Sequence, residues 1–158
     1  MTRRWLRPYK ETQMTRFGTT LLCALMLAAS AEASDLAIEP GQWKVTSTTV
    51  MVGAPAQSGT KARCLTAEQA SDVAKTFGPV SGTVNSTCEP AESEVTGRNL
   101  KWHLQCRGQL DLDVIASFNF DSSSHYTATV ISKGRMAGQL ISDVKTDIEG
   151  ERVGECRP

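Results

Sequence analysis

The sequence predicts a mainly β protein of the α+β class: an antiparallel meander forming a curved sheet or partial barrel, with one short helix and two disulfides. Apolar and polar residues alternate between Leu100 and Phe120, which is the period of half-buried strands. Turn sequences rich in Gly, Ser and Pro separate this stretch from shorter alternating runs. Four of the five cysteines follow the N-terminal leader, and an even number in a small exported chain predicts a disulfide framework.

Residues 1–33 are expected to be an N-terminal extension and a cleavable signal peptide. An apolar run at 19–29 follows Arg16 and precedes Ala-Glu-Ala, a sequence with small residues at its first and third positions that ends at Ala33. This order is typical of a secretory signal cleaved after Ala33, and translation can start at Met1 or Met14. The apolar run is shorter than the roughly 20 residues that span a membrane. We therefore expect a periplasmic or secreted protein with a single domain at 34–158 and no membrane span in its mature form.

The charge balance excludes nucleic acid as a partner. Removal of residues 1–33 leaves 12 basic and 15 acidic residues, a formal net charge of −3. The basic face that nucleic-acid-binding domains present is missing from this pattern.

The first part of the mature chain predicts one strand and one helix. A Pro-Gly turn precedes a β-branched run at 42–52, which indicates a strand, and residues 53–60 have the composition of a loop. Thr66 and Gln69 have the spacing of a capping box at the start of a helix. One apolar face of that helix would carry Ala70, Val73, Ala74 and Phe77.

The alternating stretch is too long for one strand and therefore predicts hairpins. A three-residue loop centred on Gly108 would place Cys106 opposite Leu110 and keep the apolar residues on one face. Further turns are expected at 121–125 and 132–135, with a last loop at 149–151.

The same register predicts the disulfide pairing. A hairpin turn at 96–98, centred on Gly97, places Cys88 directly opposite Cys106, where a small adjustment allows a bond. Cys64 and Cys156 would then form the second disulfide by elimination. In the chain-entropy view, the longer bridge contributes about 4–5 kcal/mol and the shorter about 3 kcal/mol.

Several of these sequences together resemble a known family. They are Pro-Gly-Gln-Trp at 40–43, Cys-Leu-Thr-Ala-Glu-Gln at 64–69, the middle cysteines, and Val-Gly-Glu-Cys at 153–156. The chain is similar over nearly the whole mature region to the DUF 3617 family of proteobacterial exported proteins, whose function is unknown. The resemblance implies a periplasmic location in a Gram-negative bacterium, and it implies no activity, ligand or functional residue.

The chemistry-bearing residues form no catalytic, cofactor-binding or metal-binding motif, so we expect no cofactor and no enzyme activity. Binding of a small apolar molecule or of another envelope protein is the leading hypothesis. The candidate ligand face consists of Trp102, Phe118, Phe120, Tyr126 and Met136, and the alternative that these residues are ordinary core, covered by the helix and Trp43, is the favoured interpretation of them.

Two alternatives remain open. A hydrolase-type enzyme could use Asp111 and Asp113 with His103 in a cleft, because paired carboxylates and a histidine can serve as acid and base. A structural or stress-related envelope component would need no pocket. On the other strand face, Ile115, Ile131 and Ile141 predict either a second small core under the helix or an exposed contact patch.

The leader and the disulfides can be tested by one measurement. Intact-mass spectrometry of the exported protein should give a chain beginning at Ser34, with a mass four hydrogens below the reduced value. A mass that includes residues 1–33 would contradict the predicted cleavage, and a fully reduced mass would contradict the disulfide framework.

Overall fold

The computed structural model describes residues 36–80, 86–89 and 92–157. The predicted extension, signal peptide and cleavage site lie outside the described residues. The described part contains eight strands and two short helices: β1 Gly41–Met51, β2 Gln57–Leu65, α1 Ala67–Ser71, α2 Val73–Phe77, β3 Ser86–Cys88, β4 Glu92–Thr96, β5 Asn99–Gly108, β6 Asp111–Asn119, β7 His125–Met136 and β8 Gln139–Gly154.

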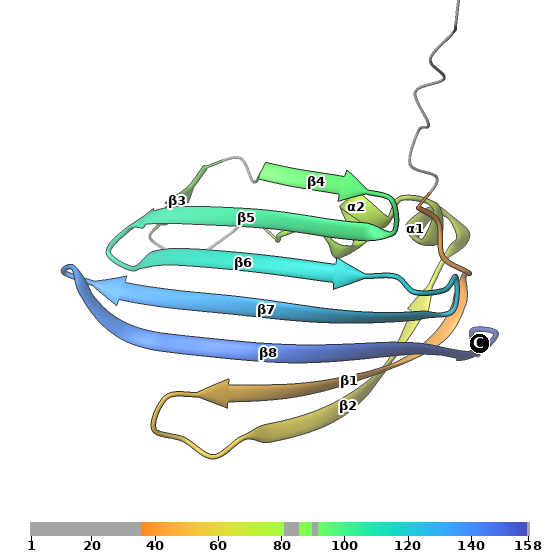
Figure 1. Cartoon of the computed structure of the whole chain (residues 1–158), viewed down its shortest axis with the longest axis horizontal. Helices are drawn as coiled ribbons and strands as arrows, with labels where there is room; N and C mark the ends of the chain where they lie inside the picture. The colour runs from red at the N-terminus through yellow and green to blue at the C-terminus, as the bar shows by residue number, and fades with distance from the viewer. Residues whose placement is uncertain (1–35, 81–85, 90–91, 158) are drawn as a thin grey trace, which may run out of the picture. The chain divides into compact units, whose positions relative to one another are not determined.

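The eight strands form one antiparallel sheet, which confirms the predicted fold class. Its order is β2-β1-β8-β7-β6-β5-β3, with β4 also paired to β5 (Figure 1). The meander from β5 to β8 is therefore extended by the first strand, because β1 pairs with the last strand β8. The sheet is open, since β2 lies at one edge and β3 and β4 lie at the other.

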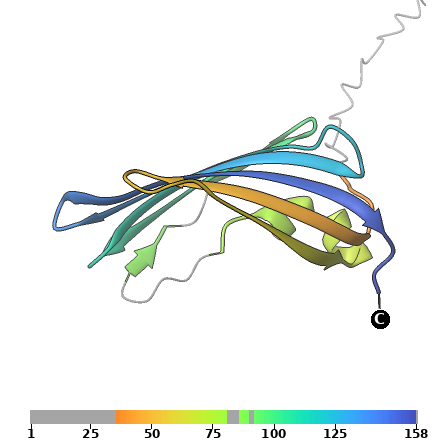
Figure 2. The same cartoon turned by 90° about the horizontal axis from the view of Figure 1, so that it is seen from below.

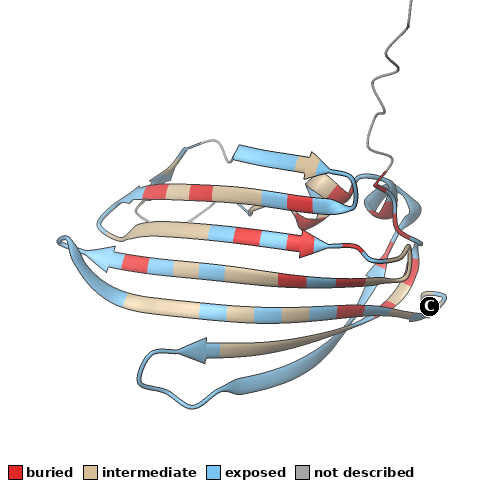
Figure 3. Ribbon diagram, viewed as in Figure 1, coloured by how far each residue is buried: buried red, intermediate tan, exposed pale blue. Residues whose placement is uncertain are grey.

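The sheet is curved, and α1 and α2 cover one end of one of its faces (Figure 2). We call the face under the helices the inner face and the opposite one the outer face. The buried residues lie mainly at the helix end, and much of the rest of the sheet is half-buried or exposed (Figure 3).

The helical segment differs from the prediction, because it forms two five-residue helices rather than one. The capping box of Thr66 and Gln69 is present at the start of α1. Asp72 then leaves the helical conformation, with φ −114° and ψ 75°, and its side chain accepts a hydrogen bond from the Lys75 amide at 3.0 Å. A side chain that caps a new helix competes with continuation of the old one, so the chain changes direction at Asp72.

The strand β2 corrects the prediction of a loop at 53–60. Six of its first eight residues are polar or glycine, and all eight are exposed, so the alternation that marks a half-buried strand is lacking. Its backbone pairs with β1 along its whole length. Hydroxyl pairs reinforce this contact, with Thr46 Oγ1 3.2 Å from Thr60 Oγ1 and Thr48 Oγ1 2.9 Å from Ser58 Oγ.

Two predicted turns, at 132–135 and 149–151, are wrong because their glycines lie inside long strands. A Cβ at Gly134 would overlap the Ser142 hydroxyl, and a Cβ at Gly150 would overlap the ring of Tyr126. Both glycines therefore permit close approach within the sheet rather than a turn. The real β7–β8 turn is at Ala137 and Gly138, with φ of 49° and 78°, the pair of positive φ angles that a tight hairpin requires.

The β5–β6 hairpin is also displaced from its predicted register. Cys106 pairs with Leu112 rather than with Leu110, and Gly108 is part of the strand. Asp111 closes this turn by accepting a hydrogen bond from the Gly108 amide at 3.1 Å. Because the partner changes by two residues, every side chain stays on its predicted face.

The edge formed by β3 and β4 places Cys88 opposite Cys106, although the hairpin turn has two residues rather than the predicted three. Thr96 pairs directly with Asn99, which moves this register by one residue. Cys88 on β3 pairs with Cys106 on β5, as the predicted register requires. The register against β5 therefore differs by one residue between β3 and β4. The structure contains the disulfides Cys88–Cys106 and Cys64–Cys156, the two pairs that the sequence register predicts.

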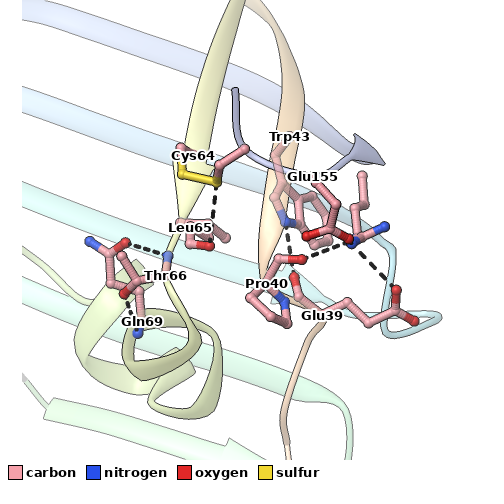
Figure 4. Close-up of a disulfide and its surroundings, with 10 residues drawn as sticks. Glu39, Pro40, Trp43, Cys64, Leu65, Thr66, Gln69 and Glu155 are labelled. Carbon is pink, nitrogen blue, oxygen red and sulfur yellow. Dashed lines mark hydrogen bonds and ion pairs between the residues drawn. A yellow bond between two sulfur atoms is a disulfide. The ribbon is translucent and has the colours of Figure 1, made fainter. Parts of the chain in front are cut away.

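The Cys64–Cys156 disulfide holds the start of the helical segment against the C-terminal end of the sheet (Figure 4). In the same region the indole of Trp43, which is fully buried, donates a hydrogen bond to the Glu39 carbonyl at 3.1 Å. Arg152 donates to the Pro40 carbonyl at 2.7 Å. These contacts tie the chain before β1 to the end of β8, so both ends of the described domain are fixed at the helix end of the sheet.

The close approach at Gly150 can be tested directly. Gly150→Ala should lower the free energy of unfolding by about 1–3 kcal/mol, because the new methyl group displaces the buried Tyr126 ring. Gly59→Ala is the matched control in an exposed strand with nothing within 4 Å, and its effect should stay within about 0.5 kcal/mol. Urea unfolding with the disulfides intact measures both. Equal effects of the two substitutions would contradict the packing at Gly150.

Candidate binding groove

A groove lies between α2 and the inner face of the sheet, with a volume of about 490 Å³. Its lining comes from β1, β2, β6, β7, β8 and the end of α2: Val45, Lys61, Ala62, Arg63, Thr76, Phe77, Gly78, Phe118, Tyr126 and Ile148. A volume of this size falls within the roughly 300–1,000 Å³ of small-molecule sites.

The floor of the groove is apolar because four adjacent strands each direct one large side chain to the inner face. These side chains are Val45, Phe118, Tyr126 and Ile148. Small partners alternate with them across the sheet, since Ala128 lies between Phe118 and Ile148, and Gly150 lies between Tyr126 and Val45. This alternation of large and small residues leaves the floor uneven and only partly filled. Val45 and Ile148 are accordingly half-buried.

The wall of the groove is Phe77 at the end of α2. Its ring centroid lies 5.0–5.5 Å from those of Tyr126, Phe120 and Phe118, in edge-to-face geometry with each. The Trp102 indole donates a hydrogen bond to the Phe77 carbonyl at 2.9 Å, which fixes the end of the helix over β5. The wall is thus held by both aromatic packing and a backbone hydrogen bond.

The rim carries two cations from the edge strand β2, Lys61 and Arg63. Both face inward, because Arg63 pairs with Trp43 in the β1–β2 register and Lys61 pairs with Val45. The Arg63 guanidinium lies 5.5 Å above the Phe77 ring centroid and donates a 3.5 Å hydrogen bond to the Thr76 carbonyl. Within the described part of the chain, neither cation forms an ion pair with a carboxylate.

The Tyr126 side chain is the main polar group in the floor. It is only 3% exposed, and its ring carbons cover Gly150 on the neighbouring strand β8. Burial raises the pKa of the Tyr126 phenol, and the positive charge of Arg63 acts in the opposite direction. The hydroxyl has no hydrogen-bond partner among the described residues, so it is a neutral donor available inside the groove.

The five residues of the predicted ligand face are distributed along the same face. Phe118 and Tyr126 line the groove, while Phe120 is fully buried in the core beneath Phe77. Trp102 is half-buried next to α2, with its N–H bonded as described above. Met136 lies far from them at the β7–β8 turn and is 52% exposed. The structure therefore brings two of the five together at the groove.

Sequence reasoning missed several groove residues. Lys61 and Arg63 belong to β2, whose polar sequence has no strand signal. Ile148 lies in β8, directly before residues 149–151, where the sequence predicts a loop and the strand in fact continues. Val45 could have been found, because it alternates with Trp43 in the first strand.

The residues of the hydrolase alternative lie on the outer face, away from the groove. His103 Nε2 is 3.2 Å from Asp113, and Gln105 donates to the same carboxylate at 3.1 Å. Partial burial acts to raise the pKa of Asp113, but the hydrogen bonds from Gln105 and His103 outweigh it and lower the pKa. Asp111 accepts the Gly108 amide in the turn. Asp113 is thus held as a carboxylate, whereas a general acid needs a raised pKa.

The isoleucines of the outer face do not form a second core under the helices, because the helices lie on the inner face. Ile115 and Ile131 are cross-strand neighbours and are 48% and 36% exposed. Ile141 is 56% exposed near the β7–β8 turn. They are exposed apolar positions on strands.

His125 forms a cluster with two carboxylates at the helix end of the sheet. Its Nδ1 lies 2.9 Å from Asp121, before β7, and its Nε2 lies 3.2 Å from Glu149 on β8. The hydrogen bonds to Asp121 and Glu149 raise the pKa of His125, against a smaller opposing effect of burial. Since both ring nitrogens contact carboxylates, the protonated imidazolium holds the turn before β7 against β8.

Among the residues that the structure describes, no group of three or more His, Cys, Asp or Glu side chains could hold a metal ion. In the same ranges, neither helix has the length and hydrophobicity needed to cross a membrane. The two disulfides are compatible with an extracytoplasmic protein.

Comparison with known proteins gives one match. A family model described as a protein of unknown function (DUF3617) matches residues 38–156, from the segment before β1 to the last cysteine. No curated protein and no solved structure matches the chain. The match covers the sheet, both helices and every residue that lines the groove, so the described groove lies within the family domain.

The His125 cluster predicts a pH-dependent contribution to stability. Because the folded pKa is raised, the contribution is complete below the unfolded value near 6.5 and is lost as pH rises through the folded pKa. His125→Gln should therefore lower stability by about 0.5–1 kcal/mol at pH 5.5 and by less at pH 9. Urea midpoints of the two proteins at both pH values measure the difference.

The double variant Asp121→Asn, Glu149→Gln is the control for this effect. In that background, His125→Gln should have the same small effect at pH 5.5 and pH 9, because the imidazolium has lost both carboxylate partners. An undiminished effect of His125→Gln at pH 9 in the otherwise unchanged protein would show that the ring acts by packing alone.

Proposed function

Because the chain belongs to the DUF3617 family, whose function is unknown, we propose its role from its own geometry: it is a non-enzymatic periplasmic protein that binds a small apolar molecule in the groove beside α2. The observation that carries this proposal is the apolar floor of Val45, Phe118 and Ile148 beneath the wall of Phe77. An enclosed apolar surface with a few polar groups at its edge is the usual form of a small-molecule site.

The covering of the inner face supports binding over simple core packing. The two helices have five residues each, whereas the strands beneath them have 9 to 16 residues from β5 to β8. Helices of that length cover one end of the face only. Val45 and Ile148 at the edge of the covered region remain half-buried, and a bound apolar molecule would complete their burial.

A periplasmic location fits the chemistry of the two disulfides. Bonds of this kind persist in oxidising compartments and are rare in the bacterial cytosol. The signal-like leader of residues 1–33 supplies the matching route of export. A periplasmic carrier would need no cofactor and no catalytic group, in agreement with the proposal.

Binding to another envelope protein is the second candidate, favoured by exposed apolar residues at the hairpin ends. They lie on the β1–β2 and β7–β8 hairpins, at the end of the sheet opposite the helices (Figure 1). The most exposed are Val52 at 82%, Ile141 at 56%, and Met136 and Leu140 at 52% each. Exposed apolar clusters commonly mark protein contacts.

The groove can be blocked without touching the helices. Ile148→Trp places a larger ring in the floor and should weaken binding of the neutral apolar probe N-phenyl-1-naphthylamine by about tenfold or more. Fluorescence titration of the probe measures the affinity. The wild-type protein should bind it saturably, in a one-to-one ratio.

Ile131→Trp is the matched control, since it makes the same change on the outer face of the same sheet. It should leave probe affinity unchanged, within about twofold. Circular dichroism of both variants checks that the fold is retained. Equal loss of binding in the two variants, or no saturable binding by the wild-type protein, would refute the groove as the site.

A further inference from the structure

We infer that the groove selects an amphiphile with an anionic head group, whose head is bound by Arg63, Lys61 and the Tyr126 hydroxyl while its chain lies on the apolar floor. This inference rests on the proposed function and adds to it the class of ligand. It follows from the charge of the rim, the unused hydroxyl and the continuation of the floor along the sheet.

The charge of the groove is wholly positive. Among the residues that the structure describes, Lys61 and Arg63 are the formally charged residues of its lining, and none of these lining residues is a carboxylate. Three other lysine and arginine side chains of the described chain pair with carboxylates, Lys133 with Asp143, Lys145 with Asp147, and Arg152 with Glu39 and Glu155, and the remaining seven do not. A ligand anion would give Arg63 a partner of opposite charge.

Two acidic residues line a different hollow that Arg63 also borders. Glu68 and Asp72 share a separate hollow with Arg63 and Lys75, beside the two helices. Neither carboxylate comes within ion-pair distance of Arg63 in the described structure. Arg63 thus stands between this hollow and the groove, with its guanidinium over the Phe77 ring that forms the groove wall.

The Tyr126 hydroxyl is the second element of the head-group site. A buried hydroxyl without a hydrogen bond is unfavourable, and Tyr126, a residue only 3% exposed, has no hydrogen-bond partner for its hydroxyl in the described residues. Its ring carbon Cζ, which carries the hydroxyl, lies over Gly150 of β8, and the positive charge of Arg63 acts on the phenol. An anionic oxygen bound near both groups could accept hydrogen bonds from the Tyr126 hydroxyl and from the Arg63 guanidinium.

The apolar chain of the ligand has a continuous path. Beyond Ile148 and Phe118 the inner face continues away from the helices with Val130 on β7 and Val114 on β6, both half-buried. Val130 lies beside Ala116, which is fully buried next to Phe118 on the same strand. A head at the rim and an unbranched chain along these strands would use both the cations and the half-buried apolar side chains.

Three ligands with the same ten-carbon chain separate head-group selection from apolar binding: decanoate, decanol and decyltrimethylammonium, each measured by displacement of N-phenyl-1-naphthylamine. The wild-type protein should bind decanoate about tenfold or more tightly than decanol, and decyltrimethylammonium most weakly. Arg63→Glu should abolish the preference for decanoate and improve binding of decyltrimethylammonium, with decanol affinity changed by less than about threefold. Tyr126→Phe keeps the ring and should weaken decanoate alone.

Arg135→Glu is the control, because it makes the same change in net charge at an exposed position near the β7–β8 turn. It should leave the order of the three ligands unchanged. Arg63→Gln, which also removes the charge, repeats the test if Arg63→Glu unfolds. Equal affinity for decanoate and decanol in the wild-type protein, or equal effects of Arg63→Glu and Arg135→Glu, would overturn this inference while the groove itself remains a binding site. Failure of both the probe and decanol to bind would overturn the proposed function as well.

Discussion

Packing of Phe77 against the inner face is the interaction on which the rest of the domain depends. An open sheet with one apolar face must cover that face, and the described part of the chain offers two helices of five residues for this purpose. Phe77 contacts three aromatic rings of the sheet, and its carbonyl accepts the Trp102 indole. The same ring lies beneath Arg63 and forms the wall of the groove. Phe77 therefore packs in the core, fixes the position of α2 on the sheet and lines the groove.

The shortness of the helices is also what leaves a groove. A longer helix would cover the inner face and complete an ordinary core, whereas the observed pair covers one end and leaves half-buried side chains beside it. The Cys64–Cys156 disulfide joins the end of β2 to the segment after β8, and the Arg152 hydrogen bond to the Pro40 carbonyl joins β8 to the segment before β1. Both contacts lie at the end of the sheet that the helices cover. Rigid support of this kind is what a preformed binding site requires.

The inaccuracies of the predicted fold share one physical cause. Gly134 and Gly150 look like turn residues in the sequence, but each provides space for a side chain from a neighbouring strand, Ser142 and Tyr126 respectively. The turn at Ala137 lacks the Asn or Asp that usually marks such hairpins. The strand β2 is held by backbone pairing to β1, which leaves no pattern in its side chains. These features depend on what lies across the sheet, which local sequence does not record.

The sequence by itself determined the class of fold, the capping box of the first helix, the faces of the central strands and the pairing of the cysteines. It could do so because period-two alternation, capping and cross-strand register are local properties. Only the tertiary structure decided that β1 pairs with β8 and that β2 extends the sheet beyond it. That long-range pairing places Lys61 and Arg63 above Phe77 and Tyr126 and thereby creates the groove, because its two sides come from segments that the chain order separates.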